Sequence, residues 1–470
     1  MQHVSTRGEA PVLGFSDALL AGLARDGGLY LPQSWPRLDA AAIAALAGRP
    51  YAAAAQTVIG PFVDGDIAQR DFAAMTEAAY ATFRHPAVCP LTQIGDNLFV
   101  LELFHGPTLA FKDVAMQLLG RMMDAVLART GRRATIVGAT SGDTGSAAIE
   151  AFCGLERVDV FILYPHGRVS PVQRRQMTTV RADNVHAIAV EGDFDDCQAL
   201  VKAMFNHHAF RDALSLSGVN SINWARIVAQ VVYYFTAAVT LGSPHRPVSF
   251  SVPTGNFGDI LAGWVAKQMG LPIETLAIAT NANDILARTL ATGRYERTGV
   301  VATTSPSMDI QISSNFERLL FEAVGRDAGI VRGMMDSLSQ SGAFTIPEPA
   351  LAAIRRDFVA GRADEDAVKA EMARTWKAAG YLLDPHTAVG VSVGRSVLER
   401  APATPLVVLG TAHPAKFPKA VHDATGVEPA LPQHLVDLHD RQERFSVLPN
   451  DLQRVEDFIR ERARAGSETA

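Results

Sequence analysis

The sequence predicts an α/β protein in which parallel sheets are flanked by helices. From about residue 96 onward, short runs of β-branched residues alternate with helical stretches. This alternation is typical of βαβ units, whose helices connect neighbouring parallel strands. Before residue 96 the chain is rich in alanine and mostly helical in pattern. Three strand-like runs end in unusual loops, and ligands of parallel sheets bind beyond the carboxyl ends of the strands. The chemistry of the protein is therefore expected in those loops.

The hydrophobic pattern places the elements along the chain. In the N-terminal region, helical patterns cover residues 40–46 and 67–83, and a turn covers 26–32. Strands are predicted at 135–137, 158–163, 187–190, 248–252, 275–278 and 406–409. Helices are predicted at 113–128, 145–152, 194–205, 223–240 and 260–269, followed by charge-rich helical patterns at 348–379 and 452–465.

Composition and charge exclude several classes of protein. The chain has 470 residues, of which 48% are hydrophobic and 20% charged, so disordered, collagen-like and disulfide-scaffold proteins are excluded. A net charge of −6 argues against a nucleic-acid partner, because proteins that bind nucleic acids are normally basic. Cys89, Cys153 and Cys197 form no CxxC pair. The cysteines therefore predict neither a disulfide framework nor a metal site, and they fit a reducing cytoplasm.

No targeting or membrane segment is evident. The first residues lack the basic and apolar regions of a secretory signal. The most apolar window, 227–241, is shorter than the roughly 20 residues that a membrane span needs, and it contains Gln230. It predicts a buried helix, and no membrane partner is expected.

The first unusual loop covers residues 137–146, with the sequence VGATSGDTGS between a strand and a helix. Its glycines permit a tight turn, and its hydroxyls together with free helix N–H groups could hold a carboxylate or a phosphate. The loop fits neither the nucleoside-triphosphate motif nor GxGxxG, so nucleotide binding is not supported. Alternatively, it is a plain helix cap whose glycines serve packing.

The second and third loops follow the strands 248–252 and 406–409. In the second, Gly255, Asn256, Phe257 and Gly258 offer consecutive amides as an anion nest at a helix start, and Asp259 would cap that helix. An ordinary strand-to-helix turn is the alternative, although two such loops make it less favoured. In the third, with the sequence GTAHPAKFP, the hydroxyl of Thr411 follows the strand directly and is better placed for hydrogen bonding than His413.

Lys112 is the candidate nucleophile. It lies where the apolar loop HGPTLAF enters a helix, at the positive end of the helix dipole. The dipole and the apolar neighbours both favour the neutral amine, which a Schiff-base lysine requires. The alternative is a surface lysine whose stem covers apolar neighbours.

Together these segments resemble the threonine synthase family. The lysine segment 105–113, the SGDTG loop, the GNFG loop and residues 411–417 occur in the family's order, and further matches lie at 5–8, 26–32, 305–316 and 384–389. The resemblance covers nearly the whole chain and is greatest to the longer branch shared by yeast and many bacteria. It implies pyridoxal-phosphate fold type II, like tryptophan synthase β, with two subdomains of parallel sheets flanked by helices.

The resemblance also implies a division of the chain. Residues 1–95 would form the mainly helical N-terminal region typical of threonine synthases, 96–430 the cofactor-dependent catalytic domain with its two subdomains, and 431–470 a C-terminal helical tail.

The resemblance assigns a role to each cofactor-binding residue. Lys112 matches the lysine that binds pyridoxal 5'-phosphate as a Schiff base. Thr411 matches the hydroxyl that bonds the pyridine nitrogen. Asp143 stands where many relatives have an asparagine that meets the cofactor's phenolic oxygen, and an aspartate would repel a phenolate unless a proton is shared. The cofactor and its phosphate would be bound by Gly255, Asn256, Phe257, Gly258 and Asp259.

Two segments match the family's substrate-binding residues. The loop of Thr140, Ser141, Gly142 and Thr144 would hold the substrate's α-carboxylate. The segment around Asn220, Ser221 and Arg226 resembles the one that binds the substrate's phosphate, and a guanidinium with amide and hydroxyl donors suits a phosphate. The alternative for Arg226 is a charge that flanks the buried helix 227–241.

The implied reaction converts O-phospho-L-homoserine and water to L-threonine and phosphate, the last step of threonine biosynthesis. It combines γ-elimination of phosphate with addition of water at Cβ, and the freed Lys112 amine moves the protons. The resemblance predicts a cytoplasmic lyase that is a monomer or a homodimer.

Three rival functions remain. A threonine-synthase-like phospho-lyase would share every cofactor residue but release a 2-keto acid. A catalytically silent binding paralogue is disfavoured by the intact Lys112 and glycine loops. A serine hydrolase is suggested only by GxSxG at 390–394, which lacks a preceding strand and continues a helical pattern.

Overall fold

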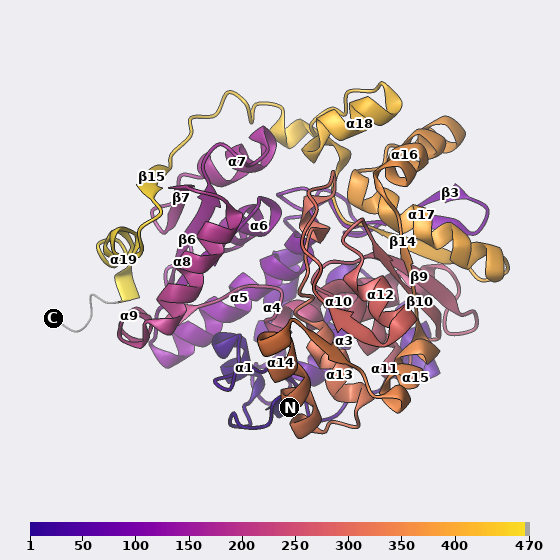
Figure 1. The fold of residues 1–470 in the computed structure, drawn as a ribbon, viewed down its shortest axis with the longest axis horizontal. Helices are drawn as coiled ribbons and strands as arrows, with labels where there is room; N and C mark the ends of the chain where they lie inside the picture. The colour runs from indigo at the N-terminus through magenta and orange to yellow at the C-terminus, as the bar shows by residue number, and fades with distance from the viewer. Residues whose placement is uncertain (466–470) are drawn as a thin grey trace.

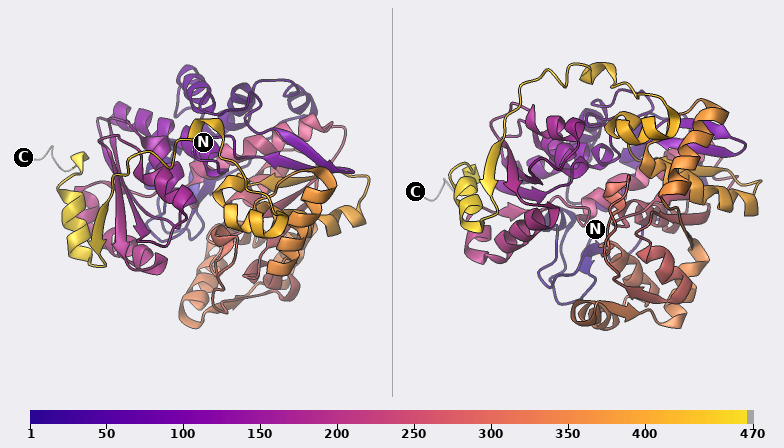
Figure 2. Two further views of the ribbon diagram at one scale, coloured as in Figure 1. Left: turned by 90° about the horizontal axis from the view of Figure 1, so that it is seen from above. Right: turned by 45° about the horizontal axis from the view of Figure 1, so that its top comes forward.

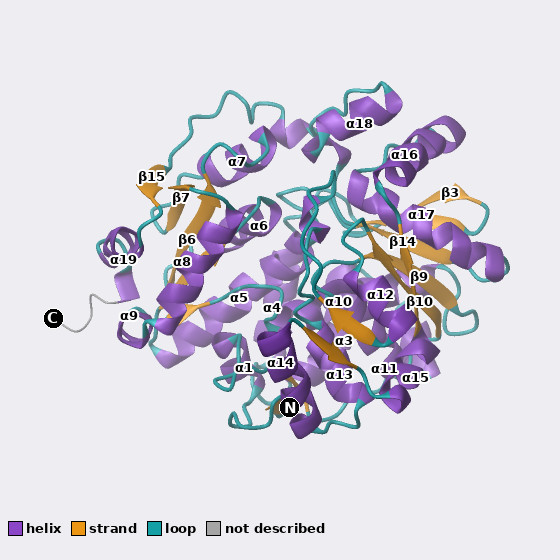
Figure 3. Cartoon of the chain, in the orientation of Figure 1, coloured by secondary structure: helices purple, strands orange, loops and turns teal. Residues whose placement is uncertain are grey.

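Two open sheets organise the chain, one in each half of the molecule (Figure 1; Figure 3). The computed structural model describes residues 1–465. The larger sheet has six strands in the order β13-β10-β9-β14-β4-β3, and all neighbours are parallel except β3 and β4. The other sheet has five parallel strands in the order β15-β7-β6-β5-β8. Helices flank both sheets, as the sequence predicts.

The strands of the larger sheet are β3 (Leu91–Gly95), β4 (Leu98–Glu102), β9 (Val248–Pro253), β10 (Ile273–Thr280), β13 (Phe358–Arg362) and β14 (Leu406–Gly410). Those of the smaller sheet are β5 (Ala134–Ala139), β6 (Val158–Pro165), β7 (Val185–Glu191), β8 (Leu216–Ser217) and β15 (Ser446–Pro449). Two short antiparallel pairs are formed by β1 (His3–Ser5) with β2 (Tyr30–Pro32), and by β11 (Arg294–Glu296) with β12 (Ala343–Thr345).

The helices of the first 206 residues are α1 (Phe15–Ala21), α2 (Ala40–Ala44), α3 (Tyr51–Val63), α4 (Gln69–Tyr80), α5 (Lys112–Thr130), α6 (Asp143–Phe152), α7 (Pro171–Thr178) and α8 (Phe194–Asn206). Those that follow are α9 (His208–Ala213), α10 (Trp224–Thr240), α11 (Gly258–Gln268), α12 (Ile285–Thr292), α13 (Phe316–Ala323), α14 (Ala328–Ser341), α15 (Glu348–Asp357), α16 (Glu365–Ala379), α17 (Pro385–Arg400), α18 (Pro418–Thr425) and α19 (Leu452–Arg460). Three short 3-10 helices are η1 (Pro306–Met308), η2 (Pro414–Lys416) and η3 (Gln433–Leu435).

All six predicted strands and all five predicted catalytic-domain helices are present, with ends within three residues of the predicted ones. The predicted helical pattern over 348–379 is wrong in its middle, because β13 separates α15 from α16. Val359 and Ala360 in β13 fit the helical pattern, but their backbone pairs with β10, so the sheet decides the local structure.

The C-terminal tail is not purely helical. After η3 it contributes β15, which pairs in parallel with β7 and adds an edge strand to the smaller sheet. Figure 2 shows this segment running from α18, beside the larger sheet, to the far edge of the smaller one. The tail therefore connects both halves, while residues 466–470 of the predicted tail lie outside the described part of the chain.

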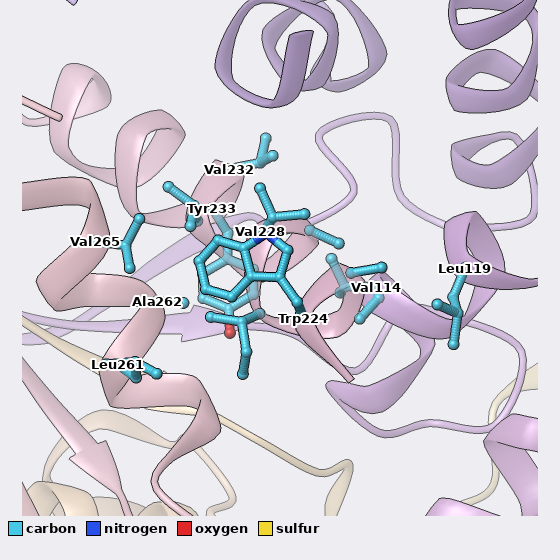
Figure 4. Packing of buried hydrophobic residues seen from close by; sticks show 14 of the residues in the cluster. Val114, Leu119, Trp224, Val228, Val232, Tyr233, Leu261, Ala262 and Val265 are labelled. Carbon is cyan, nitrogen blue, oxygen red and sulfur yellow. The ribbon is translucent and has the colours of Figure 1, made fainter. Parts of the chain in front are cut away.

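Helix α10 is the centre of the core. It packs against α3, α5 and α11, and fifteen of its seventeen residues are buried. Figure 4 shows Trp224 and Val228 of α10 between Val114 of α5 and Leu261 of α11. The apolar window 227–241 is thus a buried helix, and within residues 1–465 no helix has the length and hydropathy to cross a membrane.

The serine hydrolase alternative is not supported. Residues 390–394 lie inside α17, which Asp384 caps by accepting from the backbone N–H groups of His386 and Thr387. A nucleophile elbow requires a sharp turn between a strand and a helix. Ser392, in the third turn of a continuous helix, has no such turn.

Candidate active site

Lys112 is the first residue of α5 and is buried, with 9% of its surface exposed. The loop that precedes it is held to the loop after β14, because Phe111 N donates to the Thr411 carbonyl at 2.9 Å and His413 N to the Leu109 carbonyl at 3.0 Å. Leu109 has a φ of +62°, a left-handed conformation that these contacts maintain. The lysine therefore starts its helix next to Thr411.

The surroundings of Lys112 favour its neutral form. Burial lowers its pKa; Asp143 opposes this effect, and the nearby cations of Arg226 and Lys416 add to it. The ammonium nitrogen lies 3.6 Å from Oδ2 of Asp143 and 4.7 Å from the ring centre of Phe111. This is the desolvated amine that the sequence predicts for a nucleophilic lysine.

Asp143, at the start of α6, is an anion held by three partners. Its Oδ1 lies 2.8 Å from Nζ of Lys416 and accepts a hydrogen bond of 2.7 Å from Nε2 of Gln173. Burial would raise its pKa, but the charges of Lys416 and Lys112 and these hydrogen bonds outweigh burial and hold the pKa well below its ordinary value.

The loop 140–145 is organised by Thr140. Its buried hydroxyl oxygen accepts from the backbone N–H groups of Gly142 and Gly145, both at 2.9 Å. Gly142 has a φ of +145°, and a Cβ there would meet the Gln173 side chain at 2.4 Å. This glycine lets Gln173 reach Asp143, while Ser141 is exposed and Thr144 half-buried.

The loop after β9 is held from behind by residues 313–315. Ser313 Oγ donates to the Gly255 carbonyl at 2.6 Å, and Asn315 Nδ2 donates to the carbonyls of Asn256 at 2.9 Å and Ser221 at 3.1 Å. Asn315 thus joins the GNFG loop to the segment that precedes α10.

The backbone of the GNFG loop leaves little room for side chains. Phe257 has a φ of +64° immediately before α11. A Cβ on Gly255 would meet the Ser307 carbonyl oxygen at 2.9 Å. These contacts fix the amides of the loop at the helix N-terminus, where the helix dipole favours an anion.

Asp259 does not act as a simple helix cap. Its carboxyl Oδ1 accepts from the hydroxyls of Tyr233 and Tyr234 on α10. Burial raises its pKa to about 7, even though the tyrosine hydroxyls and Lys112 act in the opposite direction. Its Oδ2 is buried and, within the described part of the chain, has no hydrogen-bond partner.

Arg226 is buried inside α10 with 3% of its surface exposed. Its guanidinium donates to the Val219 carbonyl at 3.3 Å, whereas its buried Nε has no partner among residues 1–465, and no carboxylate there forms an ion pair with it. Burial lowers its pKa to about 10. A buried cation without a counterion is costly, so this site suits an anionic ligand.

Thr411 is positioned by α17. Its backbone N–H donates to the Thr387 hydroxyl at 3.3 Å, and that hydroxyl donates to the carboxylate of Asp384. The Thr411 side chain is buried at the carboxyl end of β14.

The structure thus brings most of the predicted residues to the ends of the strands. Asp143 and Arg226 both shift the pKa of Lys112, and Lys112 in turn lowers the pKa of Asp259. The side chains of Ser141, Asn220 and Asn256 are exposed, and Ser221 is half-buried.

Several residues that shape the site were not predicted. Lys416 and Asn315 lie in segments that resemble the family, but their residue types alone did not indicate a role. Gln173 lies outside every recognised motif. Asp384 reaches Thr411 only through Thr387, whose hydroxyl bonds both residues. The family matches at 305–316 and 384–389 were the only signals for Asn315 and Asp384.

The chain matches three protein-family descriptions: "Threonine synthase N terminus" over residues 2–80, "Pyridoxal-phosphate dependent enzyme" over 87–334, and "Threonine synthase, C-terminal" over 387–459. It is 53% identical to a threonine synthase of Pseudomonas aeruginosa, with 99% of each chain covered.

Solved structures of threonine synthases have the same fold as this chain. A threonine synthase of Brucella melitensis with bound PLP has a TM-score of 0.96 and 66% identity, covering 99% of this chain and 100% of that one. A threonine synthase from yeast has a TM-score of 0.93 and 40% identity, covering 98% of both chains. With its buried lysine, glycine loops and fold type II architecture, the chain belongs to the threonine synthase family, whose members are pyridoxal-phosphate-dependent lyases.

Proposed function

We propose that this active site converts O-phospho-L-homoserine and water to L-threonine and phosphate, and that the residues described above perform the reaction. The observation that carries the proposal is Arg226, a buried cation that pairs with no carboxylate in residues 1–465 and that lowers the pKa of the buried amine of Lys112. A dianionic substrate that also reacts with an amine-bound cofactor accounts for both groups.

The residues present fit pyridoxal 5'-phosphate. Lys112 offers a desolvated amine, and the amides of the GNFG loop, from Gly255 to Gly258, offer a phosphate cradle that a Cβ at Gly255 would obstruct. The Oδ2 of Asp259, which has no partner within residues 1–465, would donate to that phosphate when the carboxyl is protonated, which its raised pKa favours. Asn256 and Phe257 shape the cradle through their backbone.

The cofactor, when bound, supplies the electron sink that stabilises a carbanion at the substrate's Cα. Lys112 would hold the cofactor covalently and, once released by the substrate amine, would take the α-proton and then a proton from Cβ. Protons return at Cγ, which has lost the phosphate, and at Cα, while water adds at Cβ. Thr411 would hydrogen-bond the ring nitrogen as a neutral partner. Asp143 would orient Lys112 and meet the cofactor near its phenolic oxygen.

The substrate would be held at both ends. Arg226, with Asn220 and Ser221, would bind its phosphate, and the Asn315 bond to the Ser221 carbonyl holds that segment in place. The loop amides and hydroxyls of Thr140, Ser141, Gly142 and Thr144 would bind the α-carboxylate, with Thr140 acting by shaping the loop.

Product analysis in H₂¹⁸O tests the proposed reaction. The purified protein is incubated with pyridoxal 5'-phosphate and O-phospho-L-homoserine, and amino acids, 2-keto acids and phosphate are quantified. We expect threonine and phosphate in equal amounts, with ¹⁸O in the threonine hydroxyl. A 2-keto acid in place of threonine would identify the phospho-lyase, and no turnover together with no bound cofactor would identify the silent paralogue.

Thr411→Val is expected to retain bound cofactor but to lower kcat by about ten-fold to a hundred-fold. Loss of the hydrogen bond to a buried ring nitrogen costs on the order of 1–3 kcal/mol. The measurement combines steady-state kinetics with the cofactor absorbance of the variant. An unchanged kcat would show that Thr411 does not touch the ring, and Thr411→Ser, which keeps the hydroxyl, is the matched control.

Gly255→Ala is expected to weaken cofactor binding by about ten-fold or more, because the new Cβ would meet the Ser307 carbonyl at 2.9 Å and displace the cradle. Titration of the cofactor-free protein with pyridoxal 5'-phosphate measures the affinity. Gly333→Ala in α14 is the control, since its Cβ would meet no atom within 4 Å and its affinity should be unchanged. Equal affinities of the two variants would contradict the role of Gly255.

Three further statements belong to the proposal. We place the enzyme in the cytoplasm, consistent with the free thiols of all three cysteines. We propose a monomer or a homodimer. We also propose that 1–95, 96–430 and 431–470 are the units of the chain, with the catalytic residues confined to the second.

A further inference from the structure

A second buried lysine lies in the active site and has no part in the proposed reaction. Lys416, at the end of η2, has no exposed surface. Its ammonium lies 2.8 Å from Oδ1 of Asp143 and donates to the Thr108 carbonyl at 2.7 Å. A buried ammonium costs free energy unless it is paired, so its carboxylate partner matters to this site.

The contacts of Asp143 divide between its two oxygens. Oδ1 receives Lys416 and Gln173, at 2.8 and 2.7 Å, while Oδ2 lies 3.6 Å from the Lys112 ammonium. Two donors on one oxygen fix the plane and direction of the carboxylate. Lys416 and Gln173 thus direct the other oxygen toward Lys112.

Lys416 is also tied to the loop that carries Lys112. The Thr108 carbonyl accepts from Lys416 and from Nε2 of Gln176, and the Thr108 N–H and hydroxyl both donate to Asp113, next to Lys112. The position of Lys416 is therefore set by the same loop whose lysine it influences.

We propose that Lys416 is a positioning residue: it fixes and neutralises Asp143, so that Lys112 meets a charge-balanced pair rather than a lone carboxylate. A lone buried carboxylate beside Lys112 would hold a proton on the amine, whereas the proposed reaction needs the amine free. The same charge allows an aspartate to stand beside the phenolic oxygen of the cofactor. This inference rests on the proposed function, in which Lys112 is the cofactor lysine.

Other charged groups surround this arrangement and stay constant in the test. The charge of Arg226 on α10 lowers the pKa of Lys112, and Lys112 lowers that of Asp259 on α11. Lys416 lowers the pKa of Asp113 in α5, whereas Glu150 in α6 raises it. Since none of these groups is changed in the variants below, differences among the variants report on Lys416 and Asp143.

The test measures the proton affinity of Lys112 directly. Full-length protein from which the cofactor has been removed is labelled with acetic anhydride across a pH series, and Lys112 acetylation is quantified by peptide mass mapping. Only the neutral amine reacts, so the pH dependence of the rate gives the pKa of Lys112. The variants are Lys416→Met, Asp143→Asn and the double variant, with Lys419→Met as a control. Lys419 is exposed and pairs with Asp423 on the surface.

The single variants should shift the labelling profile in opposite directions. Lys416→Met leaves an unbalanced carboxylate and should move the profile to higher pH by about one unit. Asp143→Asn leaves the Lys416 cation alone and should move it to lower pH. The double variant removes both charges and should return close to the parent profile, as should Lys419→Met. A role of Lys416 in folding alone would move none of these profiles.

Two more variants guard against a folding defect. Lys416→Gln keeps a side-chain donor but loses the charge, and should behave like Lys416→Met; Lys416→Arg keeps the charge and should stay near the parent. An unchanged profile in folded Lys416→Gln, or shifts of the same sign in Lys416→Gln and Asp143→Asn, would overturn the proposal.

A separate measurement shows whether the proposed function, rather than the role of Lys416, is wrong. Borohydride reduction of the parent holoenzyme followed by peptide mapping shows which lysine holds the cofactor. If the cofactor is found on a lysine other than Lys112, the assignment of Lys112 fails. If it is on Lys112 but the labelling profiles are unchanged, only the role of Lys416 fails. In the holoenzymes, the cofactor absorbance should show pH transitions displaced in the same order as the labelling profiles.

Discussion

Replacing Lys112 with alanine is expected to reduce threonine formation by roughly 1,000-fold or more while leaving the fold intact. The variant loses both the covalent attachment of the cofactor and the amine that moves the protons, and general acid–base catalysis alone typically contributes roughly 10²–10⁴-fold. The fold should tolerate the change, because Asp143 keeps its contacts with Lys416 and Gln173. Steady-state kinetics and thermal unfolding of the purified variant are the measurements.

Two comparisons make the Lys112 result specific. Lys112→Arg keeps a cation beside Asp143 but cannot hold the cofactor covalently, so it should be as inactive as Lys112→Ala. Lys419→Ala changes an exposed lysine in the first turn of α18 and should retain full activity. Threonine production at more than a trace level by either Lys112 variant would show that another amine performs the chemistry.

The sequence predicts the central elements of the fold well, because their patterns are strong. Strand β6 is buried along its whole length, as parallel strands covered by helices on both faces are, and after Asp159 it reads as a continuous apolar run. Helix α10 likewise reads as an apolar segment, because nearly all of its residues face the core. Burial on every side leaves a clear signal in the sequence.

Edge elements carry a weaker signal. β8 has only two residues, and β15 has four residues of alternating exposure, so both depend on the ladder that they form with a neighbouring strand. β13 lies within a helical pattern and is a strand because β10 offers an unpaired edge. Pairing with a distant strand decides these structures, and a local pattern cannot reveal it.

The same limit applies to the active site. The apolar residues that precede Lys112 predict its desolvation, which is a local property, and the structure agrees. The neutralisation of Asp143 depends on Lys416, far along the chain, and on Gln173 in another helix. The resemblance to the family implies that an aspartate beside the cofactor needs compensation, but only the three-dimensional structure identifies the residue that supplies it.

Replacing Arg226 with alanine is expected to lower kcat/KM for O-phospho-L-homoserine by about 100-fold or more, equivalent to roughly 3 kcal/mol of charge-assisted hydrogen bonding. Phosphate distinguishes this substrate from homoserine, and a site built to bind a group strongly rejects analogues that lack it. Arg226 is a buried cation whose Nε has no partner among residues 1–465 and whose charge lowers the pKa of Lys112. The cofactor content and absorbance should stay close to those of the parent.

A second buried arginine provides the matched control for this prediction. Arg318 is also buried, but its donors are used by the protein: they bond the carbonyls of Tyr30 and Ile222 and the side chain of Asn315. Arg318→Ala should therefore lower the melting temperature markedly, because it leaves buried acceptors unpaired. Arg226→Ala should lower the melting temperature much less, because it breaks one long bond, to the Val219 carbonyl, and removes a buried cation that no carboxylate in residues 1–465 neutralises. If Arg226→Ala instead lost its cofactor, or used O-phospho-L-homoserine as well as the parent does, the phosphate of the substrate must bind elsewhere.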